Sequence, residues 1–419
     1  MSQLCHPNIE LAFCSKCSIF IRPSSHDTGC GSSKHFRPLN DYKGFIFETD
    51  CDLTEMDLEI QRMDHHIEKL QIQRALACRE RNRHAPIARL PIEIISEVFL
   101  WGFFNTYVGG YDTKPTTFPL LLGKVCHRWR HIAWGLTALW SYLHCCISKR
   151  RCSSQADLLK DWLARSQLRL LSIRITMEDE DAWTSATNTS TEIMDVLARH
   201  CSRWHRLSLV LPEHWYEKLS QVRGQVHNLI SLSIRPPGRI FVLKTLDVFS
   251  DAPNLRTLHS SHYYLHDLHC PWTQLTTAAL GTASVDEALE LIRRCPNLTT
   301  CQFEDLNAME GNFTADVVTN SQIQFLEISL DPSVMFNEIF AYLLLPNLCN
   351  LGLTLPETHG TPIPAIEAFI ERSASPLKVV HINGPFINEQ DIVTFLIYNQ
   401  SVTDIKVQSP TNFNTQATD

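Results

Sequence analysis

The stretch that decides the fold of this chain is RLPIEIISEVFLWGFF, residues 89–104, followed after a polar loop by PLLLGKVCHRWRHIA, residues 119–133. In both stretches apolar residues recur at steps of three and four, which predicts two helices. Pro91 stands just inside the predicted start of the first helix, where its missing N–H and fixed φ carry no cost. The positions that keep the helical period are Leu90, Ile94 and Val98 in the first stretch and Leu121, Val125, Trp129 and Ile132 in the second.

These two predicted helices carry more apolar surface than a single seam between them would bury. Ile95, Phe99 and Trp101 add to the apolar positions of the first helix on other sides of its circumference. A unit of roughly 55 residues is also close to the lower limit for independent folding. We therefore expect a second polypeptide to cover the apolar surface that remains exposed.

The spacing of these residues resembles the F-box motif. The matching elements are Leu90-Pro91, then Val125-Cys126 with Trp129-Arg130, and finally Leu139-Trp140. The chain is most similar to the F-box-like proteins of mushroom-type fungi, which carry a short heptad helix before the motif and a repeat region after it. The resemblance covers residues 53–144. One departure is the long loop of residues 105–117 between the first two helices.

The resemblance implies a function in protein ubiquitination. It makes the chain the substrate-receptor subunit of a Skp–cullin–F-box ubiquitin ligase, which binds a Skp-type linker subunit and, through it, a cullin. The repeat region would then bind a target protein. The residues that would contact the linker or support that surface are Leu90, Pro91, Ile94, Val98, Val125, Trp129 and Trp140, with Trp140 the first candidate for packing inside the motif instead.

A heptad pattern precedes the motif over residues 51–84. Leu53, Ile60 and Ile67 occupy one seam position, whereas Arg74 falls on the same seam and weakens its end. Three heptads are the minimum for a coiled coil. The alternative is a single amphipathic helix that folds back on the F-box unit. The other seam position is occupied by Met56, Met63, Leu70 and Ala77.

The region from residue 155 to residue 410 is repetitive. The pattern apolar-x-x-apolar-x-apolar recurs ten times, mostly 20 to 29 residues apart, which is the period of leucine-rich repeats. Strand and helix patterns alternate, and no unit can bury its own apolar side, so a stacked solenoid is favoured over a compact α/β fold. The expected fold class is thus α/β: a helical F-box unit over residues 85–147, then an irregular leucine-rich-repeat solenoid with a parallel sheet, and a disordered tail over residues 411–419. The copies begin at Leu168, Trp204, Leu229, Leu255, Leu275, Leu298, Ile323, Leu348, Leu377 and Val402.

Further details of the repeats predict local structure. Thr189-x-x-Glu192 and Ser284-x-x-Glu287 have the spacing of capping boxes at two helix starts. No Asn occupies the ninth position of a repeat, where an asparagine ladder would form. Proline, which cannot extend a hydrogen-bonded strand, stands there in five units. These are Pro212, Pro237, Pro356, Pro385 and Pro410, and an Asn-Leu doublet opens four units, at Asn228, Asn254, Asn297 and Asn347.

One face of the repeat strands is the predicted target-binding face. Strand side chains alternate between the two faces, so the third and fifth positions of each repeat point away from the core. Their mixed polar character fits protein binding, and a merely solvated strand face is the alternative for each of them. The candidates are Ser231, Ser233, Thr257, His259, Thr300, Gln302, Asn350, His381 and Lys406.

Composition limits the classes of partner and compartment. The net charge of −8 argues against nucleic acid, which requires a basic stripe. No apolar run approaches the ~20 residues that span a bilayer, and residues 1–23 lack the features of a signal peptide. The 15 cysteines are therefore expected to be reduced thiols in a cytoplasmic or nuclear protein that contacts no membrane.

Residues 1–50 form an expected flexible segment with one metal-like feature. Cys14 and Cys17 have the spacing of zinc ligands, and His26, Cys30 and His35 could complete a site, but no second tight pair of ligands follows. Elsewhere no phosphate-binding loop, nucleophile elbow or catalytic set occurs. We expect a protein that is not an enzyme and that holds neither a metal nor another cofactor.

The rival to the adaptor hypothesis is a plain interaction scaffold. In that hypothesis the F-box-like unit binds no linker and only caps the solenoid, because repeat arrays need a cap at each end. A zinc-dependent nucleic-acid module within residues 1–50 is a third and weaker alternative.

Overall fold

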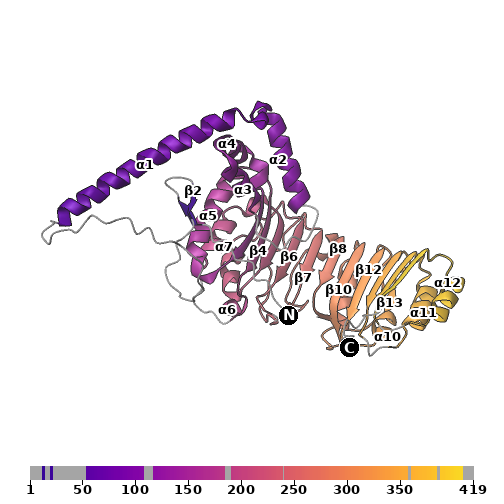
Figure 1. The fold of residues 1–419 in the computed structure, drawn as a ribbon. Coiled ribbons are helices and arrows are strands. Elements are labelled where there is room, and N and C mark those ends of the chain that lie inside the picture. Colours follow the sequence, from indigo (N-terminus) through magenta and orange to yellow (C-terminus); the bar gives the residue numbers. More distant parts are fainter. Residues whose placement is uncertain are drawn as a thin grey trace, which may run out of the picture. The chain divides into compact units, whose positions relative to one another are not determined.

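The computed structural model describes residues 12–14, 19–21, 53–107, 117–184, 190–238, 240–356, 360–384 and 387–408 (Figure 1). The chain divides into two compact units, residues 1–76 and residues 77–419, and we describe each by itself. The proposed zinc ligand Cys17, the expected flexible segment apart from two short strands, and the expected tail lie outside the described residues.

The first unit contains two short strands and most of a long helix. β1 (Ala12–Cys14) pairs antiparallel with β2 (Ile19–Ile21). α1 (Leu53–Arg83) is a continuous helix of 31 residues that runs on into the second unit, so the helix predicted over residues 51–84 is present. Side chains from Glu55 to Ala77 are exposed.

The second unit begins with three helices, α2 (Ile92–Tyr107), α3 (Phe118–Val125) and α4 (His127–Gly135). The prediction of one helix over residues 119–133 is wrong, because the backbone at Cys126 is extended and separates α3 from α4. The Sγ atom of Cys126 accepts the N–H of Trp129 at 3.4 Å and so caps the start of α4.

A large parallel sheet forms the body of this unit, which confirms the α/β class. Its main strands lie side by side in sequence order, as Figure 1 shows for β4 to β12, and β9 joins the sheet by pairing with β10. It begins at β3, ahead of the expected start of the repeats at residue 155. The strands of this sheet are β3 (Tyr142–Ile147), β4 (Leu171–Met177), β5 (Trp204–Val210), β6 (Ser231–Arg235), β7 (Thr257–Ser260), β8 (Thr277–Leu280), β9 (Ala283–Ser284), β10 (Thr300–Asn307), β12 (Phe325–Leu330), β14 (Asn350–Thr354), β15 (Val379–Asn383) and β16 (Asp404–Gln408).

Short helices connect many of the strands and cover one face of the sheet. Strand residues alternate between buried and partly exposed, as in β4 and β14, so one face packs against the core and the other faces solvent. A separate two-stranded parallel sheet pairs β11 (Val318–Thr319) with β13 (Leu343–Leu344). The connecting helices are α5 (Cys152–Arg165), α6 (Asp181–Thr184), α7 (Glu192–Ala198), α8 (Tyr216–Ser220), α9 (Val285–Arg294), α10 (Phe336–Phe340), α11 (Ile363–Ser373) and α12 (Glu389–Tyr398).

The predicted repeat pattern matches the strand register except in its first copy. Leu207 of β5, Leu232 of β6 and Leu258 of β7 are register partners, and each is the middle apolar residue of its predicted copy. In the first copy Ile173 takes this place opposite Leu207, two residues later than predicted. Leu168, the predicted first core residue, is 92% exposed, so that copy was placed wrongly.

An asparagine ladder links four neighbouring pairs of turns. Each Nδ2 donates at 2.7 Å to a backbone carbonyl 24 to 27 residues earlier in the chain. The ladder uses the Asn-Leu doublets that open the repeat units, just before the strands, rather than the ninth position, where no Asn occurs. The pairs are Asn228 with Ser202, Asn254 with His227, Asn297 with Thr273 and Asn347 with Ser321.

Of the two predicted capping boxes, one is present. Ser284 and Glu287 form the reciprocal pair at the start of α9. At α7 the N-cap is Thr191 instead of Thr189, which lies outside the described residues. Strands β5, β6 and β14 each end two residues before the predicted proline, at Pro212, Pro237 and Pro356, whereas Pro385 and Pro410 lie outside the described residues.

Candidate functional site

Helix α2 is apolar on two opposite faces. Ile95, Phe99 and Phe103 lie on one face and are buried in the core. Ile94 and Val98 lie on the other face together with Trp101, and all three are exposed, Trp101 to 73%. Because a contiguous exposed apolar patch on a soluble protein marks an interaction surface, the exposed face is the first candidate site.

Helix α3 also carries exposed apolar side chains. Leu121 and Val125 are exposed, one helical turn apart. α2 and α3 meet where the Phe118 ring packs over Gly102, since a Cβ atom at Gly102 would lie 3.2 Å from the ring. We define the apolar surface as six of the exposed apolar side chains of this region, namely Leu90, Ile94, Val98, Trp101, Leu121 and Val125.

Two arginines hold the helices that carry the apolar surface. Arg128 donates to the carbonyl oxygens of Ala88 and Leu90 at 2.5 and 2.7 Å, which ties α4 to the turn before α2. Arg130 Nε donates to the carbonyl oxygen of Gly123 at 2.8 Å. Both arginines therefore serve to position the backbone of this helical segment.

The two predicted tryptophans have different positions. Trp129 is partly buried, and its ring packs edge-on against Phe99 at 4.8 Å. Trp140 is only 2% exposed, and its Nε1 donates to the carbonyl oxygen of Ala133 at 2.8 Å. Its ring lies 4.7 Å from the ring of Trp162 on α5. Trp140 therefore packs inside this unit, between the helical segment and the sheet-bearing body, which is the alternative expected for it.

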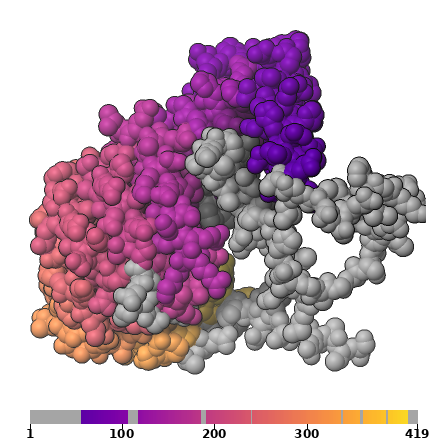
Figure 2. Space-filling model, turned by 90° about the vertical axis from the view of Figure 1, so that its left-hand side faces the viewer, coloured from indigo at the N-terminus to yellow at the C-terminus, as the bar shows by residue number. Residues whose placement is uncertain are grey.

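Of the other predicted surface residues, Leu90, Pro91, Ile94 and Val98 are exposed, as is Val125. Sequence reasoning thus placed five of seven residues at the surface. It left out Trp101 and Leu121, although the helical period that selected Ile94 and Val125 also points to them. In Figure 2 the magenta to orange residues of the sheet-bearing part of the second unit pack into one continuous body.

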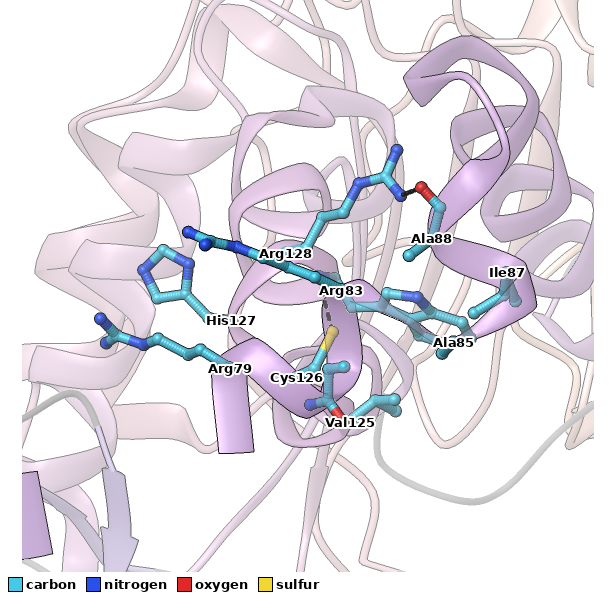
Figure 3. Close-up of a pocket in the computed structure, with 11 residues that line it drawn as sticks. Arg79, Arg83, Ala85, Ile87, Ala88, Val125, Cys126, His127 and Arg128 are labelled. Carbon is cyan, nitrogen blue, oxygen red and sulfur yellow. Dashed lines mark hydrogen bonds between the residues drawn. The ribbon is translucent and has the colours of Figure 1, made fainter. Parts of the chain in front are cut away.

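A hollow of about 480 Å³ adjoins Val125 and Trp129 (Figure 3). Figure 3 shows Arg79 and His127 on one side and Ile87 on the other. No carboxylate is among the described lining residues, and Arg83 is the one lining arginine paired with a neighbouring carboxylate, at 2.7 Å from Glu80. The hollow therefore combines an apolar wall with positive charge. Its lining residues are Arg79, Asn82, Arg83, Ala85, Ile87, Ala88, Val125, Cys126, His127, Arg128 and Trp129.

The open face of the sheet brings the predicted target-binding residues together in two rows. In one row Ser231 pairs with Thr257, and the row continues through Thr300 to Asn350. In the other row, Ser233, His259, Gln302, His381 and Lys406 lie in register through the strands between them. The prediction that these nine residues share one face is confirmed.

The last strands of this face form a second hollow, of about 340 Å³. Gly352 is one of its lining residues, and a Cβ there would lie 3.3 Å from the side chain of Glu327. Glu327 accepts a hydrogen bond from Gln302 at 2.9 Å. Sequence reasoning missed Glu327, although it holds the same repeat position as Gln302. Other polar residues at this hollow are Asn350, His381, Asn383, Lys406 and Gln408.

One member of the open face has a shifted protonation equilibrium. Burial lowers the pKa of His259, while the carboxylate of Glu304 acts in the opposite direction. The net decrease favours the neutral imidazole at physiological pH. His259 therefore presents a hydrogen-bonding group rather than a cation on this face.

The part of the chain that the structure describes contains no cluster of metal ligands and no membrane-spanning helix. No three His, Cys, Asp or Glu side chains there gather closely enough to hold a metal ion. Helices in the same residues are all too short or too polar to cross a bilayer.

Comparison with known proteins assigns no family. A scan against protein-family models found no match, and a search of curated proteins found no significant similarity. The apolar surface and the open face of the sheet are therefore the two features on which a function can be argued.

Proposed function

We propose that this chain is the substrate-recognition subunit of a Skp–cullin–F-box ubiquitin ligase. In this proposal helices α2 to α4 are the F-box unit, and the apolar surface binds the Skp-type linker subunit. The sheet is an irregular leucine-rich-repeat solenoid whose open face binds the target protein. The observation that carries the proposal is the exposed apolar face of α2, whose opposite face already packs in the core.

The linker-binding part rests on the composition of the apolar surface. Interfaces are built around aromatic and aliphatic side chains that the free protein leaves in water, with tryptophan prominent among the energetically dominant residues. Trp101 is such a residue, and Val98 and Ile94 lie about one and two helical turns before it on the same face. The adjoining hollow, with Arg79 and Arg128 at its wall, suits a partner segment that combines apolar and acidic side chains.

The solenoid part rests on the order of the strands and on the asparagine ladder. Strands that follow one another in the sequence are neighbours in the sheet, as expected when each repeat contacts mainly the repeats beside it. Equivalent residues then form rows across the open face, and a target would be bound by side chains from many repeats. The second hollow, around Gly352, is a recessed candidate contact on that face.

The mechanism in this proposal is positional. The chain would supply no catalytic group; it would hold a target lysine near a ubiquitin-conjugating enzyme that the cullin carries. Holding the two reactants together raises their effective concentration and removes much of the entropic barrier to transfer. The ligase would act in the cytoplasm or the nucleus.

A matched pair of variants tests the linker-binding proposal. Val98→Asp places a carboxylate in the apolar surface, and Val393→Asp makes the same change on α12, at valines that are 56% and 49% exposed. A charge buried without a partner at an interface costs several kcal/mol, so Val98→Asp should lower the affinity for the linker by about 100-fold or more. The wild type and Val393→Asp should co-purify with linker and cullin. A wild type that recovers neither, or a Val98→Asp variant that binds normally, would count against the proposal.

The scaffold hypothesis has one observation in its favour. Phe103 contacts Tyr142 of β3 with ring centroids 6.1 Å apart, and Trp140 contacts Trp162, so the helical segment does cover one end of the sheet. This contact uses the face of α2 opposite the apolar surface, so capping leaves the apolar surface unexplained. Recovery of no linker by the wild-type protein would favour the scaffold.

A further inference from the structure

Helix α1 has exposed apolar side chains that repeat with heptad spacing. Ile60, Met63, Ile67 and Leu70 are 51–52% exposed and follow one another at alternating steps of three and four residues. This spacing places them along one seam of the helix. Such a seam is stable in water only when a second helix packs against it.

We propose that α1 packs against α1 of a second copy of this chain as an antiparallel two-stranded coiled coil over residues 56–74. This inference is independent of the proposed ubiquitin-ligase function. The choice of a second copy, and of the antiparallel direction, follows from the charges on the helix.

The charges of α1 divide into two halves of opposite sign. Within the overlap, residues 57–64 contain three carboxylates and one arginine, whereas residues 66–74 contain two cations and one carboxylate. A parallel pair would bring like halves together. An antiparallel pair lays the acidic half of each helix against the basic half of the other, so the two copies complement each other.

Arg74, the one charged residue on the seam, distinguishes the two directions. In a parallel pair it would face the partner's Arg74 across the seam, and Glu59 would face the partner's Asp64 beside it. In the antiparallel pair Arg74 lies opposite the partner's Met56, next to the partner's Asp57. The seam residue that weakens a parallel coil therefore gains an opposite charge in an antiparallel one.

The antiparallel register is set by matching the apolar layers. Ile60 packs against the partner's Leu70, and Met63 packs against the partner's Ile67, so the two-fold axis passes near His65. This register leaves residues 79–83 outside the overlap, and the hollow lined by Arg79 and Arg83 stays free.

A matched pair of variants tests whether the seam joins two copies. Ile67→Asp changes a seam residue, and Ile72→Asp makes the same change at an equally exposed position off the seam. Both residues are exposed on α1, so neither change disturbs the core. Sedimentation equilibrium of the full chain should show a monomer–dimer equilibrium for the wild type and for Ile72→Asp, and a dissociation constant at least about tenfold higher for Ile67→Asp. A wild type that is monomeric at every concentration, or an Ile67→Asp variant that dimerises as well as Ile72→Asp, would overturn the proposal.

A charge exchange tests the direction. Arg74→Glu should weaken the dimer about tenfold, because each of two symmetric sites would then hold two carboxylates. Combining it with Asp57→Arg should restore the dissociation constant of the wild-type dimer. Only in the antiparallel register does the new Glu at position 74 lie beside the partner's new Arg at position 57. A photo-crosslinking residue in place of Ile60 should link to the peptide that contains the partner's Leu70. Failure of the exchange to restore dimerisation, or a crosslink to the partner's residue 60, would overturn the antiparallel arrangement.

Discussion

Replacing Trp140 by Ala should destabilise the protein while leaving the apolar surface intact. The side chain is 2% exposed, its ring packs on Trp162, and its Nε1 donates to the carbonyl oxygen of Ala133. Truncating a buried tryptophan costs about 3–5 kcal/mol, which includes the cavity, the lost ring contacts and the carbonyl left without its donor. We expect Trp140→Ala to fall in this range.

The assay is urea unfolding followed by circular dichroism, with the midpoint and the slope compared between variants. The matched control is Trp101→Ala, the same change at a side chain that is 73% exposed, which should alter the free energy of unfolding by no more than about 0.5 kcal/mol. The affinity for the linker should show the opposite pattern. It should fall for Trp101→Ala and stay unchanged for Trp140→Ala once that variant is folded. A Trp140→Ala variant that loses less than about 1 kcal/mol, or a Trp101→Ala variant equally destabilised, would refute the burial argument.

Three further changes test the packing of the repeats. Asn254→Ala removes one rung of the asparagine ladder and should lower the free energy of unfolding by about 1 kcal/mol in urea titrations, whereas an unchanged midpoint would contradict the ladder. Glu287→Ala leaves two buried backbone N–H groups without their acceptor and should cost about 2–4 kcal/mol in the same assay, and a cost under 1 kcal/mol would contradict that role. The hydrogen bond from Arg235 holds the pKa of Glu180 below its ordinary value of 4.5, so this pair stabilises the fold above that pH and loses its effect as the pH falls through the lowered pKa. Glu180→Gln should therefore cost about 1 kcal/mol at neutral pH, since the pair is partly exposed, and the difference from the wild type should vanish in acid; a difference that persists there would contradict the linkage.

Helical and strand periods predicted the parts of the fold in which side-chain burial repeats. The α2 helix and the middle apolar positions of the sheet followed from spacing alone, because burial selects apolar residues at the period of the element. The predicted position of the first repeat was wrong because spacing alone allows two alignments there. Leu168, Leu171 and Ile173 match the pattern as well as Leu170, Ile173 and Ile175 do, and only pairing with β5 decides between them.

Features that depend on one hydrogen bond to the backbone could not be predicted from the spacing of apolar residues. The break at Cys126 leaves the helical period of Leu121, Val125 and Trp129 uninterrupted in the sequence, yet the thiol caps a new helix there. The asparagine ladder was visible as Asn-Leu doublets, but its hydrogen bonds join turns that meet only after the strands pair. The sequence around each Asn therefore does not predict which carbonyl oxygen it binds.

The candidate site was predictable to a similar extent. Exposed positions such as Val98 followed from the helical period, but the burial of Trp140 required knowing that Trp162 of α5 packs against it. The hollow beside Val125 is lined by residues from α1, the turn before α2, and α4, so no single stretch of sequence indicates it.

Hydrogen–deuterium exchange of the full chain, with and without a purified Skp-type linker, tests the central claim directly. The account predicts that the linker slows exchange in peptides from α2 and α3, which carry the apolar surface, and leaves the strands β12 to β16 unchanged. Unchanged exchange in α2 and α3 at saturating linker, or protection confined to the sheet, would contradict it.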